Sequence, residues 1–180
     1  MRCEPFLLLD CAAQQGGVAF SSSGSKLAIG GHQMVSVFDY TTGGMVVKIN
    51  QDGRVRCVAL SKNGACLIVG GFDRKVRLHA IEIGTELRTF HADSRAATVR
   101  SVHLSTDSTL MAMGTEASGK GAAILYTASS ATKRCLHTWN HDMPVWCVRL
   151  SPTVKMLAVG GYDMSLTIYS TSTYALMRRI

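Results

Sequence analysis

The sequence predicts an all-β protein that is built from repeated four-stranded antiparallel units. Between Pro144 and Ser170, three short apolar and β-branched runs are separated by Ser-Pro and Gly-Gly turns, which is a pattern of strands and hairpins. A motif of apolar residues that ends in serine recurs as VAFS, VRCVALS, VRSVHLS and VWCVRLS, and its closing serines lie 40, 44 and 46 residues apart. Gly-Gly follows the next apolar run in three units, and Gly-Thr takes its place in the third unit. Because the serine-terminated motif and the Gly-Gly motif recur with similar spacing, they indicate four tandem repeats.

Each unit divides into predicted strands when the chain is taken in order. The first two units are expected to form strands at 17–20, 26–30, 34–40, 45–49, 55–60, 66–70, 75–81 and 85–90. The third unit begins at Val99 and has a lengthened link, 114–121, before a strand at 122–127. The fourth unit is expected at 145–150, 155–159, 166–169 and 174–180, and the apolar FLLLD segment within residues 1–13 is expected to be a leading strand.

Units of about 40 to 45 residues with four strands and Gly-rich turns are typical of the blades of a β-propeller. We therefore expect a single propeller domain over residues 1–180, with blades at about 14–50, 51–92, 93–140 and 141–180. Both faces of each blade are expected to be apolar, with Trp146, Val148 and Leu150 on one face of a strand and Val145 and Cys147 on the other. Stacking of neighbouring blades then removes this surface from water and stabilises the fold.

From about residue 16 onward, the chain resembles the WD-repeat family of β-propellers. The matching features are the V-x-x-V-x-[LF]-S run of each innermost strand, the L-x-x-G-G of the second strand, the turn residues Asp73 and Asp163, and third strands such as VSVFD and LTIYS. The dipeptide that names the family survives only as Phe38-Asp39. The resemblance implies a non-catalytic scaffold that presents loop surfaces to partner proteins.

The resemblance also implies a hydrogen-bonded network of His, Ser, Trp and the turn Asp within each blade. Apolar residues occupy the serine position in all four units, so no complete network is expected. Only His141 and Asp163 are expected to retain part of it, and apolar packing then has to contribute more of the stability.

Propellers close with about four to eight blades, and this chain supplies four. An open arc leaves an apolar face at each end, and such a face usually marks a contact site. We therefore expect a partial or open propeller that is completed by the missing blades of a longer chain or by a second copy. The longer chain is favoured because both ends interrupt a repeat, and a compact four-bladed closure is the alternative.

Composition and motifs restrict the class of function. No apolar run approaches the eighteen or so residues that span a bilayer, and the N-terminus is a poor signal peptide, so we expect no membrane association and a cytoplasmic location, with the nucleus as the alternative. Six cysteines without a C-x-x-C pair indicate packed thiols in a reducing compartment, with no metal and no cofactor. Common catalytic motifs are absent from the sequence, so a propeller enzyme is the minority hypothesis and no catalytic residue is predicted.

The segment 114–121 fits the phosphate-loop pattern G-x-x-x-x-G-K but departs from it at its end. Gly121 replaces the Ser or Thr that would hold magnesium, and a predicted strand follows where a phosphate loop needs a helix. We interpret this segment as an enlarged surface loop between two strands.

Charge suggests a second hypothesis. The net charge is +7, and nine of the 19 basic residues fall within residues 54–100, so a nucleic-acid-binding propeller that uses this basic region is the alternative function. The basic residues are spread over several strands and aromatic residues are few, which favours an ordinary solvated surface instead.

The links before the innermost strands and the links between second and third strands are expected to share one rim, because successive strands are antiparallel. A Phe or Tyr beside an Arg is typical of an interface anchor. The candidate partner-binding residues on this rim are Asp52, Arg54, Phe72, Arg74, His91, Arg95, Lys120, His141, Tyr162 and Met164.

Overall fold

The structure is a computed structural model that describes residues 16–92, 98–128 and 134–180. Within these residues it contains sixteen strands and no helix, and the strands form four antiparallel four-stranded sheets in which each strand pairs with its neighbour in sequence. The predicted all-β class and the division into four-stranded blades are confirmed. The leading strand predicted within residues 1–13 lies outside the described residues.

The strands follow the predicted bounds closely. The first two sheets contain β1 (Gly17–Phe20), β2 (Lys26–Gly30), β3 (Met34–Asp39), β4 (Met45–Asn50), β5 (Val55–Leu60), β6 (Cys66–Gly71), β7 (Lys75–Ala80) and β8 (Thr85–His91). The third and fourth sheets contain β9 (Thr98–Leu104), β10 (Leu110–Glu116), β11 (Gly121–Thr127), β12 (Cys135–His141), β13 (Val145–Leu150), β14 (Met156–Gly161), β15 (Leu166–Ser170) and β16 (Leu176–Arg179). We refer to these sheets as the first to fourth blades.

The closing serine of each repeat makes two hydrogen bonds across the first hairpin of its blade. Its side-chain oxygen accepts a hydrogen bond from the backbone N–H five residues later, and its own N–H donates to the carbonyl of that same residue. The side-chain bonds join Ser21 to Lys26 at 3.0 Å, Ser61 to Cys66 at 2.9 Å, Ser105 to Leu110 at 2.9 Å and Ser151 to Met156 at 3.1 Å. The serine hydroxyl therefore stabilises the turn between the first two strands of each blade.

A bulge in the innermost strands changes which residues share a face. In the fourth blade, Val145 and Cys147 pair with consecutive residues of β14, so Trp146 is left between them. Val145 and Val148 are consequently buried on the same face, while Trp146 and Cys147 are exposed. The prediction that grouped Trp146 with Val148 and Leu150 was wrong, because strict alternation fails where one strand carries an extra residue.

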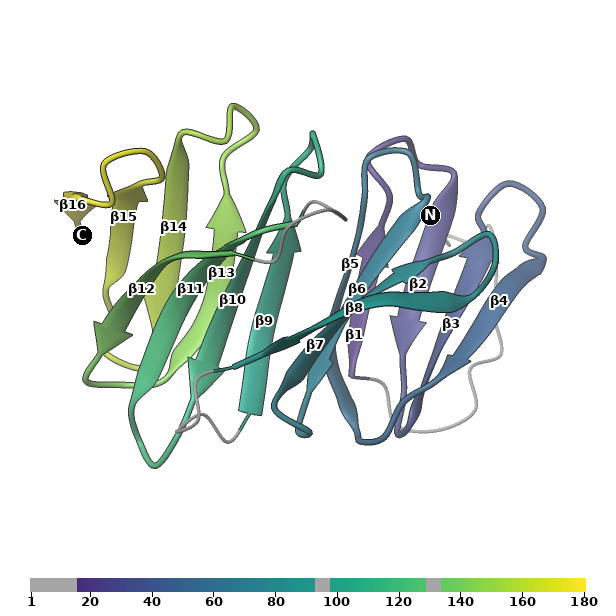
Figure 1. Cartoon of the computed structure of the whole chain (residues 1–180), viewed down its shortest axis with the longest axis horizontal. Helices are drawn as coiled ribbons and strands as arrows, with labels where there is room; N and C mark the ends of the chain where they lie inside the picture. The colour runs from purple at the N-terminus through teal and green to yellow at the C-terminus, as the bar shows by residue number, and fades with distance from the viewer. Residues whose placement is uncertain (1–15, 93–97, 129–133) are drawn as a thin grey trace, which may run out of the picture.

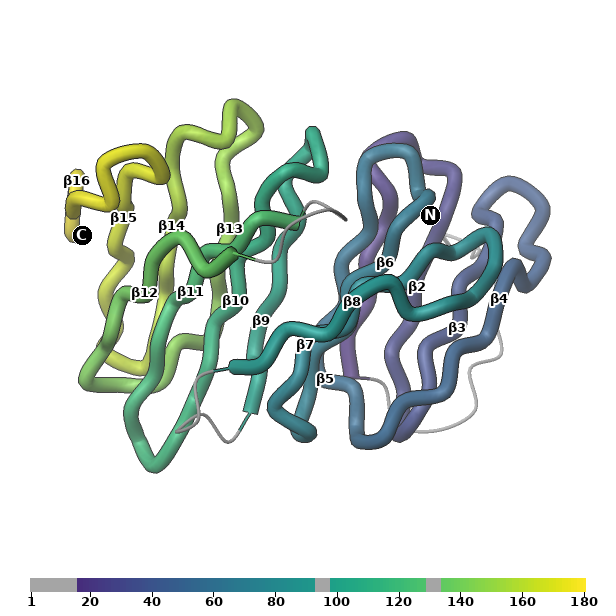
Figure 2. Tube along the Cα trace, in the orientation of Figure 1, coloured from purple at the N-terminus to yellow at the C-terminus, as the bar shows by residue number. Residues whose placement is uncertain are grey.

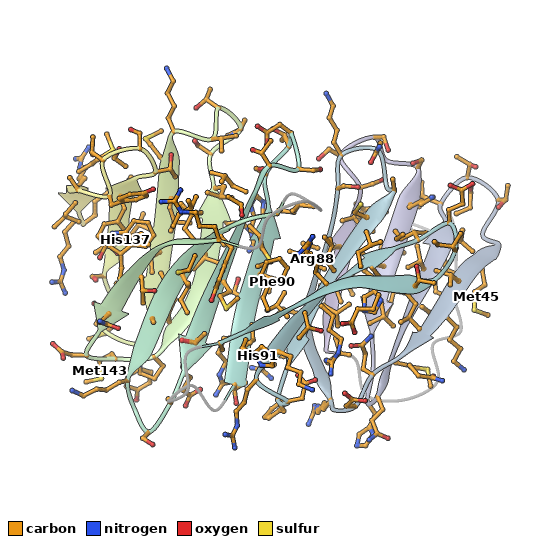
Figure 3. All side chains as sticks on the ribbon, in the orientation of Figure 1. Met45, Arg88, Phe90, His91, His137 and Met143 are labelled. Carbon is orange, nitrogen blue, oxygen red and sulfur yellow. The ribbon has the colours of Figure 1, made fainter. Side chains whose placement is uncertain are left out.

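The blades pack face to face in a row. Figure 1 shows the first and fourth sheets at opposite ends of the row, and the tube in Figure 2 shows the chain passing from one sheet to the next in sequence order. The innermost strands β1, β5, β9 and β13 contact one another in succession, and apolar clusters fill each of the three spaces between blades. Phe90, near the middle of Figure 3, belongs to the cluster between the second and third blades, where its ring meets Tyr126 edge-on.

Within the described residues, no helix is long and apolar enough to span a membrane.

Candidate interaction surface

The predicted rim exists as one edge of the row of blades. The links β4–β5, β6–β7, β10–β11 and β12–β13 lie along the lower edge of Figure 1, and His91 and Met143 are labelled near this edge in Figure 3. Backbone hydrogen bonds tie the links within a blade: Phe72 N donates to Arg54 O at 3.1 Å, and Tyr162 N donates to Pro144 O at 3.0 Å. Because each link is fixed to its neighbour, the rim is a set of short, supported turns.

The predicted partner-binding residues lie on these links with different degrees of exposure. Arg54 and His141 are half-buried, and Arg95 lies outside the described residues. The exposed members are Asp52, Phe72, Arg74, His91, Lys120, Tyr162 and Met164.

Two of these residues meet in the second blade. The guanidinium carbon of Arg54 lies 5.8 Å from the centre of the Phe72 ring, which is the geometry of a cation–π contact. Phe72 remains 43% exposed. This pair matches the expected combination of an aromatic ring with an arginine.

Asp52 belongs to an ionic network around Arg77, which the sequence did not single out. Arg77 is only 6% exposed, and its guanidinium contacts the carboxylates of Asp73, Asp52 at 2.5 Å and Glu86 at 3.4 Å. Burial by itself lowers the pKa of Arg77, but the hydrogen bond and charge of Asp73, with the other two carboxylates, raise it above its ordinary value. Arg77 therefore stays charged and holds the link before β5 against the turn between β6 and β7.

Gln51 and His79 extend this network into the space between the first two blades. Gln51 Nε2 donates to His79 Nε2 at 3.2 Å, and Gln51 Oε1 accepts from Arg77 at 3.4 Å. Burial lowers the pKa of His79, which keeps the imidazole neutral and able to accept this bond. The second blade thus uses glutamine, arginine and histidine to make polar contacts where the resemblance implied a different network.

In the fourth blade, His141 and Asp163 were expected to keep part of that network. Their charges influence each other, but no hydrogen bond joins them within the described residues. Asp163 accepts hydrogen bonds from the backbone and hydroxyl of Ser165, and it pairs with Arg179 at 3.1 Å. The buried Nε2 atom of His141 has no hydrogen-bond partner within the described residues.

The link between β10 and β11 is shorter than its predicted range of 114–121. Both strands extend into that range, and a two-residue turn at Ser118 and Gly119 joins them, with φ angles of 48° and 80°. Reciprocal backbone hydrogen bonds between Ala117 and Lys120 close the turn. The interpretation of this segment as an enlarged surface loop was wrong, because the two strands pair almost to its tip and form a tight β-hairpin. Lys120 pairs with Asp142 of the next link at 3.8 Å.

The largest aromatic pair of the rim is in the fourth blade. The rings of Trp146 and Tyr162 lie 5.4 Å apart in an edge-to-face arrangement, and they are 52% and 59% exposed. Met143 and Met164 are exposed on the two links that flank this pair, and Met164 is 97% exposed. We call these four residues the fourth-blade patch. Sequence reasoning missed Trp146 because it placed this residue on a regular strand.

Within the described residues, no group of three or more His, Cys, Asp or Glu side chains is placed to hold a metal ion. The recess beside Arg77, lined by Gln51, Arg54 and Gly70, has no space for a water-sized sphere.

Four-stranded antiparallel sheets that stack through their innermost strands define a repeat protein of the propeller class. The family model for the WD domain, G-beta repeat, matches residues 45–79 and 133–170, so the chain contains WD repeats at these two places, and its four four-stranded sheets fit a WD-repeat propeller. Each match begins near the outermost strand of one blade and ends in the third strand of the next blade. A comparison with curated proteins found no match to the chain.

Proposed function

We propose that this protein is a non-catalytic scaffold that binds partner proteins through its rim, with the fourth-blade patch as the main anchor. WD repeats are typically protein-interaction modules, which supports this class of function. The cysteines within the described residues are free thiols, which suits the reducing cytoplasm or nucleus.

The observation that carries the proposal is the exposed Trp146–Tyr162 pair. Tryptophan and tyrosine dominate the binding energy of protein interfaces because they bury a large area at a small cost in conformational entropy. Both residues are held by the backbone of a hairpin, so little further order is needed on binding. The two exposed methionines beside them offer adaptable apolar contact.

The basic region 54–100 supports nucleic-acid binding less well than its composition suggests. Arg77 is surrounded by three carboxylates, and Arg100 is paired with Glu116. These two arginines therefore offer little free positive charge to a phosphate backbone. Protein binding is the function that the exposed aromatic pair favours.

Affinity capture from cell extract with immobilised chain tests the proposal. Trp146→Ala and Tyr162→Ala are compared with Ile83→Ala, which truncates an exposed residue in the turn between β7 and β8. We expect the amount of captured protein to be at least about tenfold lower with either aromatic variant than with the wild type. The control variant is expected to capture as much as the wild type, and capture is expected to persist at high salt. Equal capture by all three variants contradicts the proposal. Capture that disappears on nuclease treatment or falls steeply with salt supports nucleic acid instead.

A further inference from the structure

In each of the first three blades, a glycine of the second strand leaves a space that a valine of the next blade fills. We call this space the glycine socket. A Cβ atom on these glycines, which lie in the second strand, would be closer than 3 Å to a valine methyl group of the following innermost strand, so only glycine leaves the necessary room. The distances from that Cβ to the valine Cγ1 are 2.6 Å for Gly30 and Val55, 2.8 Å for Gly70 and Val99, and 2.8 Å for Gly114 and Val145.

The fourth blade has the same socket without an occupant. Gly160 takes the corresponding place in β14, and a Cβ atom there would meet nothing within 4 Å. Cys147, next to it across the hairpin, is exposed, whereas its equivalent Ser101 accepts a hydrogen bond from Val148 N of the following blade at 3.2 Å. Arg149, Met156 and Leu166 on this face are also exposed. The outer face of the fourth blade therefore has the shape of a contact face for one more blade.

The first blade presents the complementary face. Val18 is equivalent in the repeat to Val102 and Val148. A Cβ atom added to Gly70 would lie 3.2 Å from Cγ1 of Val102, and one added to Gly114 would lie 3.2 Å from Cγ1 of Val148. Val18 is 56% exposed, and Phe20 beside it is similarly exposed. In the second, third and fourth blades the equivalent residues are buried against the preceding blade.

We infer that two copies of this chain associate head to tail, with the first blade of each copy on the fourth blade of the other. A head-to-tail contact closes into a ring or continues as a fibre, depending on the rotation that it applies. The rotation between blades is already set by the three contacts within the chain, and a ring of eight blades lies within the range in which propellers close. The occupant is a second copy because the chain itself displays both halves of the contact.

The proposed assembly leaves the rim accessible. Trp146 occupies the bulge position of its innermost strand, and the equivalent residue of the second blade is Arg56. Arg56 is exposed even though the third blade covers the face of its sheet. Failure of the assembly and failure of partner capture are therefore separate results.

Sedimentation equilibrium of the full chain tests the inference. The wild type is expected at twice the chain mass of 19.4 kDa. Gly160→Trp, which fills the empty socket, and Val18→Arg, on the opposite end, are each expected to weaken association at least tenfold. Ile83→Glu, at an exposed residue in the turn between β7 and β8, is the control and is expected to leave the dimer unchanged.

Mixing the two interface variants gives the most specific result. An equimolar mixture retains one intact contact, between the first blade of the Gly160→Trp chain and the fourth blade of the Val18→Arg chain, so association is expected to return in part. A monomeric wild type, a series of larger masses, or a Val18→Arg chain that still dimerises overturns the inference. Far-UV circular dichroism checks the fold of each variant, and Leu166→Arg replaces Gly160→Trp if that chain unfolds.

Discussion

Arg77 is the residue on which the second blade depends for its polar contacts. It is almost completely buried, and it joins three carboxylates to the side chain of Gln51. Removing one partner of a buried ion pair costs far more than removing a partner that water already solvates. Asp52, whose side chain is 75% exposed, is such a solvated partner.

We therefore predict different effects for two truncations of the same ion pair. Arg77→Ala is expected to lower the free energy of unfolding by about 2–4 kcal/mol, because Asp73 and Gln51 lose their buried partner. Asp52→Ala is expected to cost less than about 1 kcal/mol, since Asp73 and Glu86 still compensate the guanidinium. Urea denaturation of both variants measures the difference, and similar losses would show that Arg77 is not a network centre.

At the residue scale, the sequence predicted where the candidate residues lie on the rim better than it predicted which side chains they contact. Arg54 and Phe72 were predicted on one rim, and they do meet. The partners of Asp52 were not predictable, because Arg77 lies 25 residues away and its charge gives no direction. Whether any of the candidate rim residues binds a partner stays a prediction.

Among the structural elements, β9 and β13 show how neighbouring blades are joined at the innermost strands. Ser101 Oγ accepts from Val148 N at 3.2 Å, and His103 Nδ1 accepts from Leu150 N at 3.2 Å. Burial, and to a lesser extent the charge of Arg149, lower the pKa of His103 to about 4. A neutral imidazole is required here because a protonated ring has no free acceptor.

The contact between β9 and β13 should therefore weaken in acid. The folded pKa of His103 lies below the ordinary value of 6.5, so its contribution is complete above pH 6.5 and is lost as the pH falls toward 4. After allowance for the partial exposure of His103 to solvent, the loss is about 1–2 kcal/mol. His103→Asn keeps an acceptor without titrating, so urea midpoints between pH 4 and 7.5 should fall less in this variant than in the wild type. Parallel curves would refute the role of His103.

At the element scale, most strands were predictable because turn residues punctuate the repeats at regular intervals. Val55–Leu60 and Val145–Leu150 agree with the predicted bounds. The faces of these strands were predicted wrongly, since regular alternation was assumed and the bulges at Arg56 and Trp146 interrupt it. A column shared by Arg56, Arg100 and Trp146, all large residues in otherwise apolar runs, is the one sign that alternation was interrupted.

For the whole molecule, stability comes from contacts between successive blades, and the sequence indicated this through the apolar residues expected on both faces of each blade. Each apolar cluster lies between two neighbouring blades, as expected for a repeat protein. The role of the second-strand glycines could not be predicted from the sequence, because the valines that face them lie 25 to 31 residues further along the chain. The cytoplasmic location and the single-domain interpretation stay predictions.

The most direct test of this description is the free energy of unfolding of four matched variants, Gly30→Ala, Gly70→Ala, Gly114→Ala and Gly160→Ala, measured at protein concentrations too low for association. The first three are expected to lose about 1–3 kcal/mol, because the added methyl group overlaps the next blade. Gly160→Ala is expected to stay within about 0.5 kcal/mol of the wild type, since its socket is empty within the chain. A loss in Gly160→Ala equal to the other three, or no loss in any of them, would contradict a row of four blades that ends at an open face.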